Sequence, residues 1–253
     1  MYFPIGDMHG VYHIHRNLYD KIVDEIGQGI DPVFGGTIVF MGDYIDRGPN
    51  SKEIVDWLMN IVDFEVNGYP VNHIFLRGNH EQFPLDYLLN PYDEKHMRVL
   101  EVWLRNGGKE TLDSFDCTTQ EMIDGKIDKY LDWFRQLPII AHDPDYVFVH
   151  AGINRYTQLD KQDDFHCLWA MDRNIQAYKG YNRVVVHGHM MRKDGPIIDI
   201  ANNRIWMDIG ANSFGRAATV CLPQPFDYGY ETNGGDYKII EVKNFKLRRN
   251  KKG

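Results

Sequence analysis

Five short blocks of the sequence carry side chains that could bind divalent metal ions. Each block contains glycine and comes just after an apolar run, and in chain order they are Gly6-Asp7-Met8-His9-Gly10, Gly42-Asp43-Tyr44-Ile45-Asp46-Arg47-Gly48, Arg77-Gly78-Asn79-His80-Glu81, His150-Ala151-Gly152 and His187-Gly188-His189. Mixed nitrogen and oxygen donors suit Mn, Fe or Zn better than Ca or Mg. No single block is diagnostic, but together they supply the ligand set of a two-metal phosphoester hydrolase.

The first two blocks place carboxylates at the ends of predicted strands. Asp7 and His9 are two residues apart, so in an extended backbone their side chains point to the same side and could hold one ion. Asp43 has two carboxylate oxygens that could each bind a different ion, ~3.5–4 Å apart, and Asp46 follows on the same loop. Taken alone, the first block also suits a capped turn with a solvated histidine, and the second an Asp-rich turn with a local ion pair.

The other three blocks add amide and imidazole donors. Asn79 and His80 are adjacent on a turn set by Gly78, so we expect their side chains to point in different directions and to have different roles. His150 and His189 follow later apolar runs, each beside a glycine that permits close backbone approach, although either alone would also suit a core position. We interpret the remaining histidines as structural: His13, His15, His73, His96, His142, His166 and His187.

The elements that must position these blocks alternate between strand and helix. Apolar runs predict strands at residues 2–5, 37–41, 71–76, 146–149 and 183–186, and helices follow the first three at about 11–26, 51–66 and 84–89. Because the runs are continuous rather than alternating, we expect sheets that are covered on both faces, in an α/β fold. In such sheets ligands bind beyond the carboxyl ends of the strands, which is where the blocks fall.

The rest of the chain predicts one domain that spans residues 1–253. A mostly helical insert at about 84–136 could form a cap beside the site, and later strands are expected at 195–199, 204–209, 216–222 and 236–242. The hydrophobic fraction of 43% is enough for a sizeable core. We assign no function to the basic C-terminal residues, which are Lys243, Lys246, Arg248, Arg249, Lys251 and Lys252.

Composition excludes several functional classes. The net charge of −8 opposes the phosphate backbone of nucleic acids, so we expect no nucleic-acid partner. No apolar run approaches the ~20 residues of a membrane span, and we expect no targeting segment before the first block. Cys117, Cys167 and Cys221 are scattered and odd in number, which argues against a disulfide framework or a thiolate zinc site and fits a reducing cytoplasm.

In this order and context, the blocks closely resemble the signature of the calcineurin-like metallophosphoesterases, in particular the phosphoprotein phosphatase branch. The resemblance also includes Trp103 to Ser114 and Asp208-Ile209-Gly210-Ala211, and it covers residues 1 to about 220. It implies two packed mixed β-sheets flanked by helices, an α-β-β-α sandwich with the site above the sheet edges. It also implies two divalent metal ions, for which we expect Mn, with Fe or Zn as alternatives.

The resemblance further implies a role for each block. Six residues would hold the metals: Asp7 and His9 the first ion, Asn79, His150 and His189 the second, and Asp43 both. A metal-bridging hydroxide would be the nucleophile, in agreement with the lowered pKa of metal-bound water. Arg47 and Arg77 would bind the phosphate, and His80, oriented by Asp46, would protonate the leaving group.

Two departures from the family pattern affect the substrate side of the site. The family usually places another phosphate-facing arginine shortly after a Leu-Trp pair, but here Ala170 and Met171 follow that pair. Arg173 could replace it from two positions further on. Met190 stands where a hydroxyl residue commonly follows the Gly-His pair. The metal ligands are intact, so these changes bear on substrate preference.

Three hypotheses follow from the sequence. The first is a serine/threonine protein phosphatase-type phosphomonoesterase that acts on a phosphorylated protein or a small phosphoester. The second keeps the metal centre but assigns symmetrical cleavage of diadenosine tetraphosphate. The third, a catalytically silent binding module, is disfavoured because every metal and acid position is filled.

Overall fold

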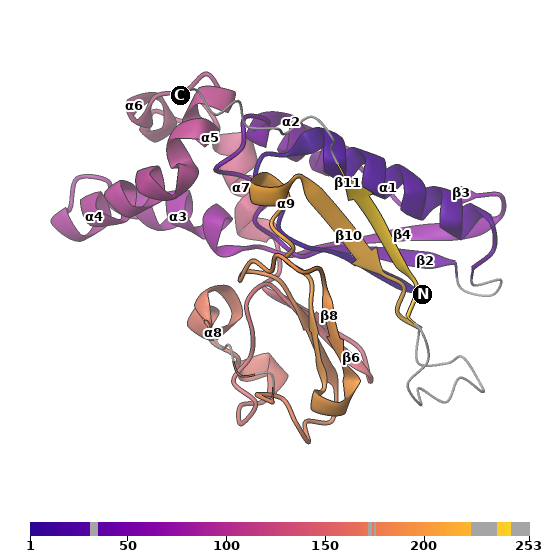
Figure 1. Ribbon diagram of the computed structural model, residues 1–253. Coiled ribbons are helices and arrows are strands. Elements are labelled where there is room, and N and C mark those ends of the chain that lie inside the picture. Colours follow the sequence, from indigo (N-terminus) through magenta and orange to yellow (C-terminus); the bar gives the residue numbers. More distant parts are fainter. Residues whose placement is uncertain (31–34, 172–173, 175, 224–236, 244–253) are drawn as a thin grey trace, which may run out of the picture.

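Two mixed β-sheets pack face to face, with helices on both outer sides (Figure 1). The computed structural model describes residues 1–30, 35–171, 174, 176–223 and 237–243. This architecture is the predicted α-β-β-α sandwich. Arg173 and most of the basic C-terminal residues lie outside the described part of the chain.

The first sheet has the strand order β1-β2-β4-β3. Its strands are β1 (Tyr2–Ile5), β2 (Gly36–Phe40), β3 (Phe64–Val66) and β4 (Tyr69–Phe75). β1, β2 and β4 run parallel, and β3 pairs antiparallel with β4. Three carboxyl ends therefore meet at one edge.

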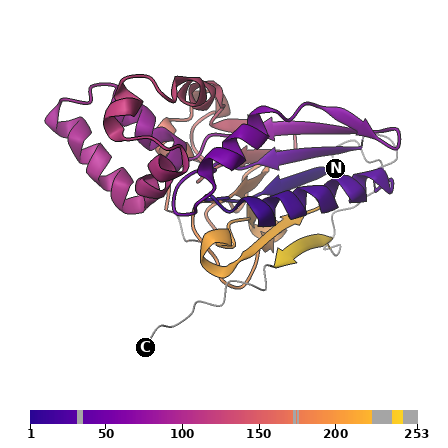
Figure 2. The ribbon, with the colours of Figure 1, turned by 90° about the horizontal axis from the view of Figure 1, so that it is seen from above.

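The second sheet has the strand order β5-β6-β7-β9-β8. Its strands are β5 (Ile140–His142), β6 (Tyr146–Val149), β7 (Val184–His187), β8 (Ile197–Asp199) and β9 (Arg204–Trp206). The central strands β6, β7 and β9 run parallel, and the two edge strands are antiparallel to their neighbours. A separate antiparallel pair, β10 (Arg216–Val220) and β11 (Ile239–Lys243), lies beside α1 (Figure 2).

Helices cover both sheets and form a group at one end of the molecule (Figures 1 and 2). α1 (Tyr12–Gly27) and α2 (Ser51–Met59) lie on the first sheet, and α8 (Asp164–Trp169) lies on the second. The helical group comprises α3 (Asn79–Leu88), α4 (Glu94–Trp103), the π-helical segment η1 (Leu104–Gly108), α5 (Lys109–Ser114), α6 (Thr119–Ile123) and α7 (Asp128–Gln136). Three short elements complete the described fold: the 3-10 turns η2 (Leu159–Lys161) and η3 (Ile200–Asn202) and the helix α9 (Ala211–Phe214).

The apolar runs that predicted β1, β2, β6 and β7 are largely buried on both faces. Phe3 and Ile38 face α1, whereas Val39 and Val186 meet between the two sheets. All four side chains are 0% exposed. Burial of this apolar surface is the main stabilising contribution to the sandwich and holds the two strand edges together. Among the described residues, no helix is long and apolar enough to cross a membrane.

Two predicted helices have different limits in the structure. The helix predicted at 51–66 ends at Met59, and β3 follows it. Asn67 and Gly68 both have positive φ angles, as an Asn-Gly hairpin turn requires, so this dipeptide pairs β3 with β4. The helix predicted at 84–89 begins earlier, at Asn79, because Glu81 accepts a hydrogen bond from the Gly78 N–H at its start.

Candidate metal centre

The five blocks converge where the carboxyl ends of the parallel strands meet. Loops after β1, β2 and β4 carry the first three blocks, and the ends of β6 and β7 carry the last two. The sandwich thus places residues from both sheets around one point. Of the predicted site residues, ten lie within the described part of the chain: Asp7, His9, Asp43, Asp46, Arg47, Arg77, Asn79, His80, His150 and His189.

Asp43 lies at the centre of this arrangement. Its Oδ2 atom is 3.5 Å from Nε2 of His9, 3.8 Å from Nε2 of His80 and 3.4 Å from Nε2 of His150. Two groups of described residues could each hold a metal ion, and Asp43 belongs to both: His9, Asp43 and His80, and Asp43, His150 and His189. A single carboxylate therefore faces two donor sets.

Asn79 extends the second donor set. Its Oδ1 atom lies 2.9 Å from Nε2 of His150 and 2.9 Å from Nδ1 of His189, and these two ring nitrogens are 3.2 Å apart. Asn79 and His80 do not lie on a turn, as the sequence suggested, but are the first two residues of α3. Their side chains nevertheless separate, because consecutive residues of a helix point in different directions.

Asp7 extends the first donor set. Its Oδ2 atom is 3.9 Å from Nε2 of His9, is buried, and has no hydrogen-bond partner among the described residues. The segment is not extended as we predicted: β1 ends at Ile5, and His9 has a φ of 43°. The N–H groups of Met8 and His9 instead donate to the Asp43 carbonyl, which folds the first loop onto the second.

Backbone carbonyls fix the orientation of two histidines. Nδ1 of His9 is 3.1 Å from the Ile45 carbonyl, and Nδ1 of His150 is 2.9 Å from the Met41 carbonyl. A carbonyl can only accept, so Nδ1 carries the proton and Nε2 offers its lone pair to the centre. This tautomer is the one that a metal-binding histidine needs. His187, which was predicted to be structural, faces away and instead pairs with Arg204 at 2.8 Å.

The Asp46 carboxylate contacts the Nδ1 side of the His80 ring. Its Oδ2 atom is 2.6 Å from Nδ1 of His80, and Trp103 Nε1 donates to both Asp46 oxygens at 2.9 and 3.1 Å. Thr111 Oγ1 donates to Asp46 Oδ1 at 2.5 Å. The Asp46–His80 pair was predicted from the sequence, whereas Trp103 and Thr111 had no predicted role, although both belong to the segment Trp103 to Ser114.

Many of these residues have an uncommon backbone conformation. Eight non-glycine residues in the described part of the chain have positive φ angles, and five of them are predicted site residues: His9, Asp43, Asp46, Arg47 and His189. Each such residue costs about 1–3 kcal/mol, so the conformation persists only where surrounding contacts offset that cost. Strain of this kind is typical of sites where backbone geometry has been fixed for function.

Glu81 enforces the conformation of the Asp43 loop. Its two carboxylate oxygens accept hydrogen bonds from the N–H groups of Asp43, Tyr44, Ile45 and Gly78, at 2.9, 2.8, 3.3 and 2.9 Å. Glu81 is 0% exposed. Glu81 had no predicted role, although an acidic residue three positions after a helix-capping glycine is a signal for such a contact.

The electrostatics of the centre favour bound cations. Burial, followed by repulsion from Asp208 and Asp43, raises the pKa of Asp7 well above its usual value. Burial and the nearby Glu81 likewise raise the pKa of Asp43. Burial lowers the pKa values of His9 and His150, so both are neutral at pH 7. Crowded carboxylates, neutral imidazoles and an unpartnered Asp7 oxygen fit divalent metal ions.

Arg47 is the cation nearest to this centre. Its Nη1 atom is 2.5 Å from Nε2 of His9, and its Nη2 atom is 3.0 Å from Nε2 of His80. Burial is the main cause that lowers the pKa of His80 well below its usual value, and the neighbouring His9 ring and Arg47 guanidinium lower it further. Arg77, the other predicted phosphate ligand, does not line the cavity beside the centre, and its N–H donates to the Pro138 carbonyl.

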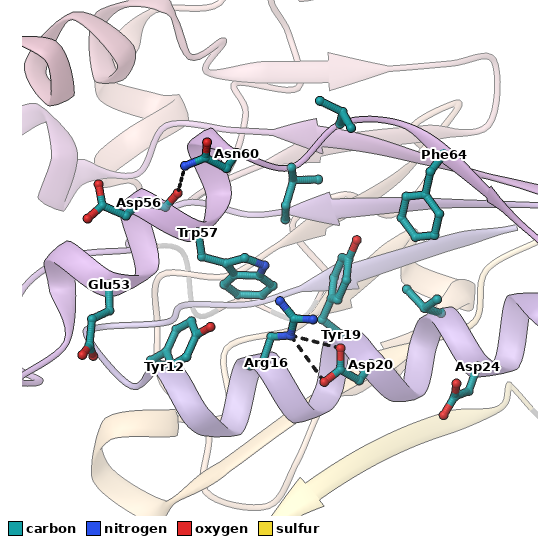
Figure 3. A pocket seen from close by; sticks show the side chains of 13 residues that line it. Tyr12, Arg16, Tyr19, Asp20, Asp24, Glu53, Asp56, Trp57, Asn60 and Phe64 are labelled. Atoms are coloured by element: carbon teal, nitrogen blue, oxygen red, sulfur yellow. Dashed lines mark hydrogen bonds and ion pairs between the residues drawn. The ribbon is translucent and has the colours of Figure 1, made fainter.

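A cavity of about 820 Å³ opens beside the centre. The described residues that line it are Arg47, Asn79, His80, Phe83, Val102, Asn106, Trp169, Met171, His189, Met190, Met191, Arg192, Trp206 and Ser213. A larger groove of about 1040 Å³ lies away from it between α1 and α2, where Trp57 and Tyr19 form the floor and Arg16 pairs with Asp20 (Figure 3). Neither metal-binding group contributes a residue to that groove.

Comparisons with known proteins identify a family and a fold. A sequence profile described as calcineurin-like phosphoesterase matches residues 5–215. A solved structure of a provisionally named diadenosine tetraphosphatase superposes with a TM-score of 0.61 and 18% identity, covering 97% of this chain and 94% of that chain. A cold-active protein tyrosine phosphatase gives a TM-score of 0.52 and 19% identity, covering 86% and 75% of the two chains. At 18% and 19% identity these two structures show a shared fold and do not indicate the substrate.

Proposed function

The chain belongs to the calcineurin-like phosphoesterase family, and from this premise we propose that it is a metal-dependent phosphomonoesterase of the serine/threonine protein phosphatase type. Its substrates would be phosphorylated proteins or small phosphoesters. The observation that supports this proposal best is the Asp43 carboxylate, which two separate donor groups share. A shared carboxylate is what places two cations close enough to act on one phosphate.

The donors would divide between two ions. Asp7 and His9 would hold one ion, Asn79, His150 and His189 the other, and Asp43 both. Bound divalent metals would supply the Lewis acidity that ionises an attacking water near neutral pH and would neutralise phosphate charge. Nitrogen and oxygen donors without thiolates suit Mn, and also Fe or Zn.

The protein side chains would bind the phosphate and provide a proton. Arg47 would hold the equatorial phosphate oxygens with its planar fork, which lies next to the ring nitrogens of His9 and His80. His80 would take up a proton at Nε2 once a bound phosphate engages Arg47, and the Asp46 carboxylate, 2.6 Å from Nδ1, would stabilise the imidazolium that gives this proton to the leaving oxygen. Trp103 and Thr111 would position Asp46 for this purpose.

Loss of the shared carboxylate is the direct test. We expect metal analysis of protein loaded with Mn and desalted to give about two ions per chain. Hydrolysis of an aryl phosphate should require Mn, and Asp43→Asn should reduce kcat by about 1000-fold or more and leave fewer than two bound ions. The proposal fails if folded wild type and folded Asp43→Asn show the same activity with Mn present.

One observation favours a second candidate, the symmetrical hydrolysis of diadenosine tetraphosphate. Phe83 and Trp169 form an edge-to-face pair on the cavity wall, with ring centroids 4.9 Å apart, and Trp206 and three methionines also line the cavity. Such a surface could stack a nucleobase. A kcat/KM for diadenosine tetraphosphate that exceeds the values for a phosphopeptide panel by orders of magnitude would select this candidate.

A further inference from the structure

The wall of the cavity beside the metal centre carries two arginine side chains. Arg47 and Arg192 line it, and no aspartate or glutamate is among the described residues on its wall. The buried carboxylates of Asp7 and Asp43 belong to the metal centre, where bound metals would neutralise them, and the buried Asp46 pairs with His80. A ligand that enters this cavity therefore meets two guanidinium groups, and the ligand chemistry that suits them is a phosphate.

The backbone of Arg192 is fixed by the end of β9. Arg192 lies in the loop that follows β7, and its backbone N–H donates to the Asp208 carbonyl at 2.9 Å, in the loop that follows β9. Trp206 Nε1 donates to the Met190 carbonyl at 2.5 Å, which ties the same loop to β9 a second time. Arg192 therefore lies on a loop that is anchored on the side of the second sheet.

The side chain of Arg192 packs against Trp206, but its Nε donor has no acceptor among the described residues. Its guanidinium carbon lies 5.1 Å from the centroid of the Trp206 ring, in a cation–π contact that orients the planar group. Its Nε atom is buried and has no hydrogen-bond partner among the described residues. A buried donor without an acceptor is unfavourable, so an anion that accepts from Arg192 would remove this cost.

From this geometry we propose that Arg192 is a substrate-binding residue that holds the phosphate together with Arg47. This inference rests on the proposed function and refines it. It also accounts for the departure in the sequence, because Ala170 and Met171 leave the usual arginine position empty and Met171 lines the same cavity. Arg192 supplies the second guanidinium group from the loop after β7. Nε of Arg77 is likewise buried and has no hydrogen-bond partner among the described residues, but Arg77 does not line this cavity.

The binding of inorganic phosphate to the Mn-loaded protein tests this proposal by calorimetry. Arg192→Gln should weaken the Kd by about tenfold or more, the loss expected for a charge-assisted contact. Arg192→Lys, which keeps the charge but not the fork, should weaken it less. Arg16→Gln is the matched control, because Arg16 lies in the distant α1–α2 groove and its loss should leave the Kd unchanged.

Hydrolysis provides an independent readout. Arg192→Gln should raise KM for an aryl phosphate more than it lowers kcat, whereas a residue that only supports Trp206 would change thermal stability and leave KM unaffected. The inference is wrong if both Arg192 variants bind phosphate within twofold of wild type. If wild type hydrolyses no phosphoester but its phosphate binding still depends on Arg192, the proposed function fails and the inference stands.

Discussion

Glu81→Gln is the substitution whose effect the structure predicts most directly. The Oε2 atom of Glu81 accepts from the N–H groups of Asp43 and Gly78, and Oε1 accepts from those of Tyr44 and Ile45. Glutamine has nearly the same shape, but one oxygen becomes an NH2 donor. Whichever way the amide is oriented, two backbone N–H groups face a donor and lose their acceptor.

The expected loss follows from these contacts. Hydrogen bonds to a charged group contribute about 1.5–3 kcal/mol each, so two lost bonds correspond to about 3–6 kcal/mol. Glu81 is 0% exposed, so water cannot replace the lost acceptors. Small proteins are stable by only about 5–15 kcal/mol, and the substitution should therefore remove a large part of the free energy of unfolding. The Asp43 loop should also lose its conformation, which would weaken metal binding.

Chemical denaturation of the metal-free protein, followed by circular dichroism, measures this loss without stabilisation by bound ligand. Glu101→Gln on the exposed face of α4 is the control and should change the free energy of unfolding by less than about 0.5 kcal/mol. Calorimetric titration with Mn then reports the metal sites. If Glu81→Gln destabilises the protein by less than 1 kcal/mol and still binds two Mn ions, the role assigned to Glu81 is refuted.

Two further predictions concern buried groups near the centre. Trp103→Phe removes the indole N–H that donates to Asp46. We therefore expect kcat for an aryl phosphate to fall by about tenfold with little change in KM. An unchanged kcat would mean that Trp103 does not position Asp46. Burial lowers the pKa of His15 from 6.5 to about 4, so as the pH falls the unfolded chain binds a proton before the folded protein does. The contribution of neutral His15 to stability is therefore complete above pH 6.5 and is lost as the pH falls toward 4. The stability lost over this pH range corresponds to about 3 kcal/mol. His15→Gln should therefore make the free energy of unfolding less dependent on pH between 6.5 and 4. An unaltered dependence would contradict the prediction.

The sequence was sufficient for the outline of the fold because apolar periodicity is a local property. Continuous runs such as residues 37–41 predicted strands buried on both faces, and β2 has that burial. The blocks after these runs predicted donors at the carboxyl ends of strands, and the parallel arrangement places them there. Local cues were misjudged at Asn67-Gly68, where the hairpin turn was overlooked, and at Asn79, where Glu81 starts a helix earlier than expected.

What the sequence could not determine were the contacts between residues far apart in the chain. Trp103 and Thr111 reach Asp46 across more than 50 positions, and Arg192 reaches the cavity only because β9 anchors its loop. Side-chain type and spacing report local conformation, whereas these contacts depend on how two sheets and a helical group pack against one another. The positions of the candidate donors at the strand ends were therefore predictable from the sequence, but the groups that orient these donors and the arginines on the cavity wall required the tertiary structure.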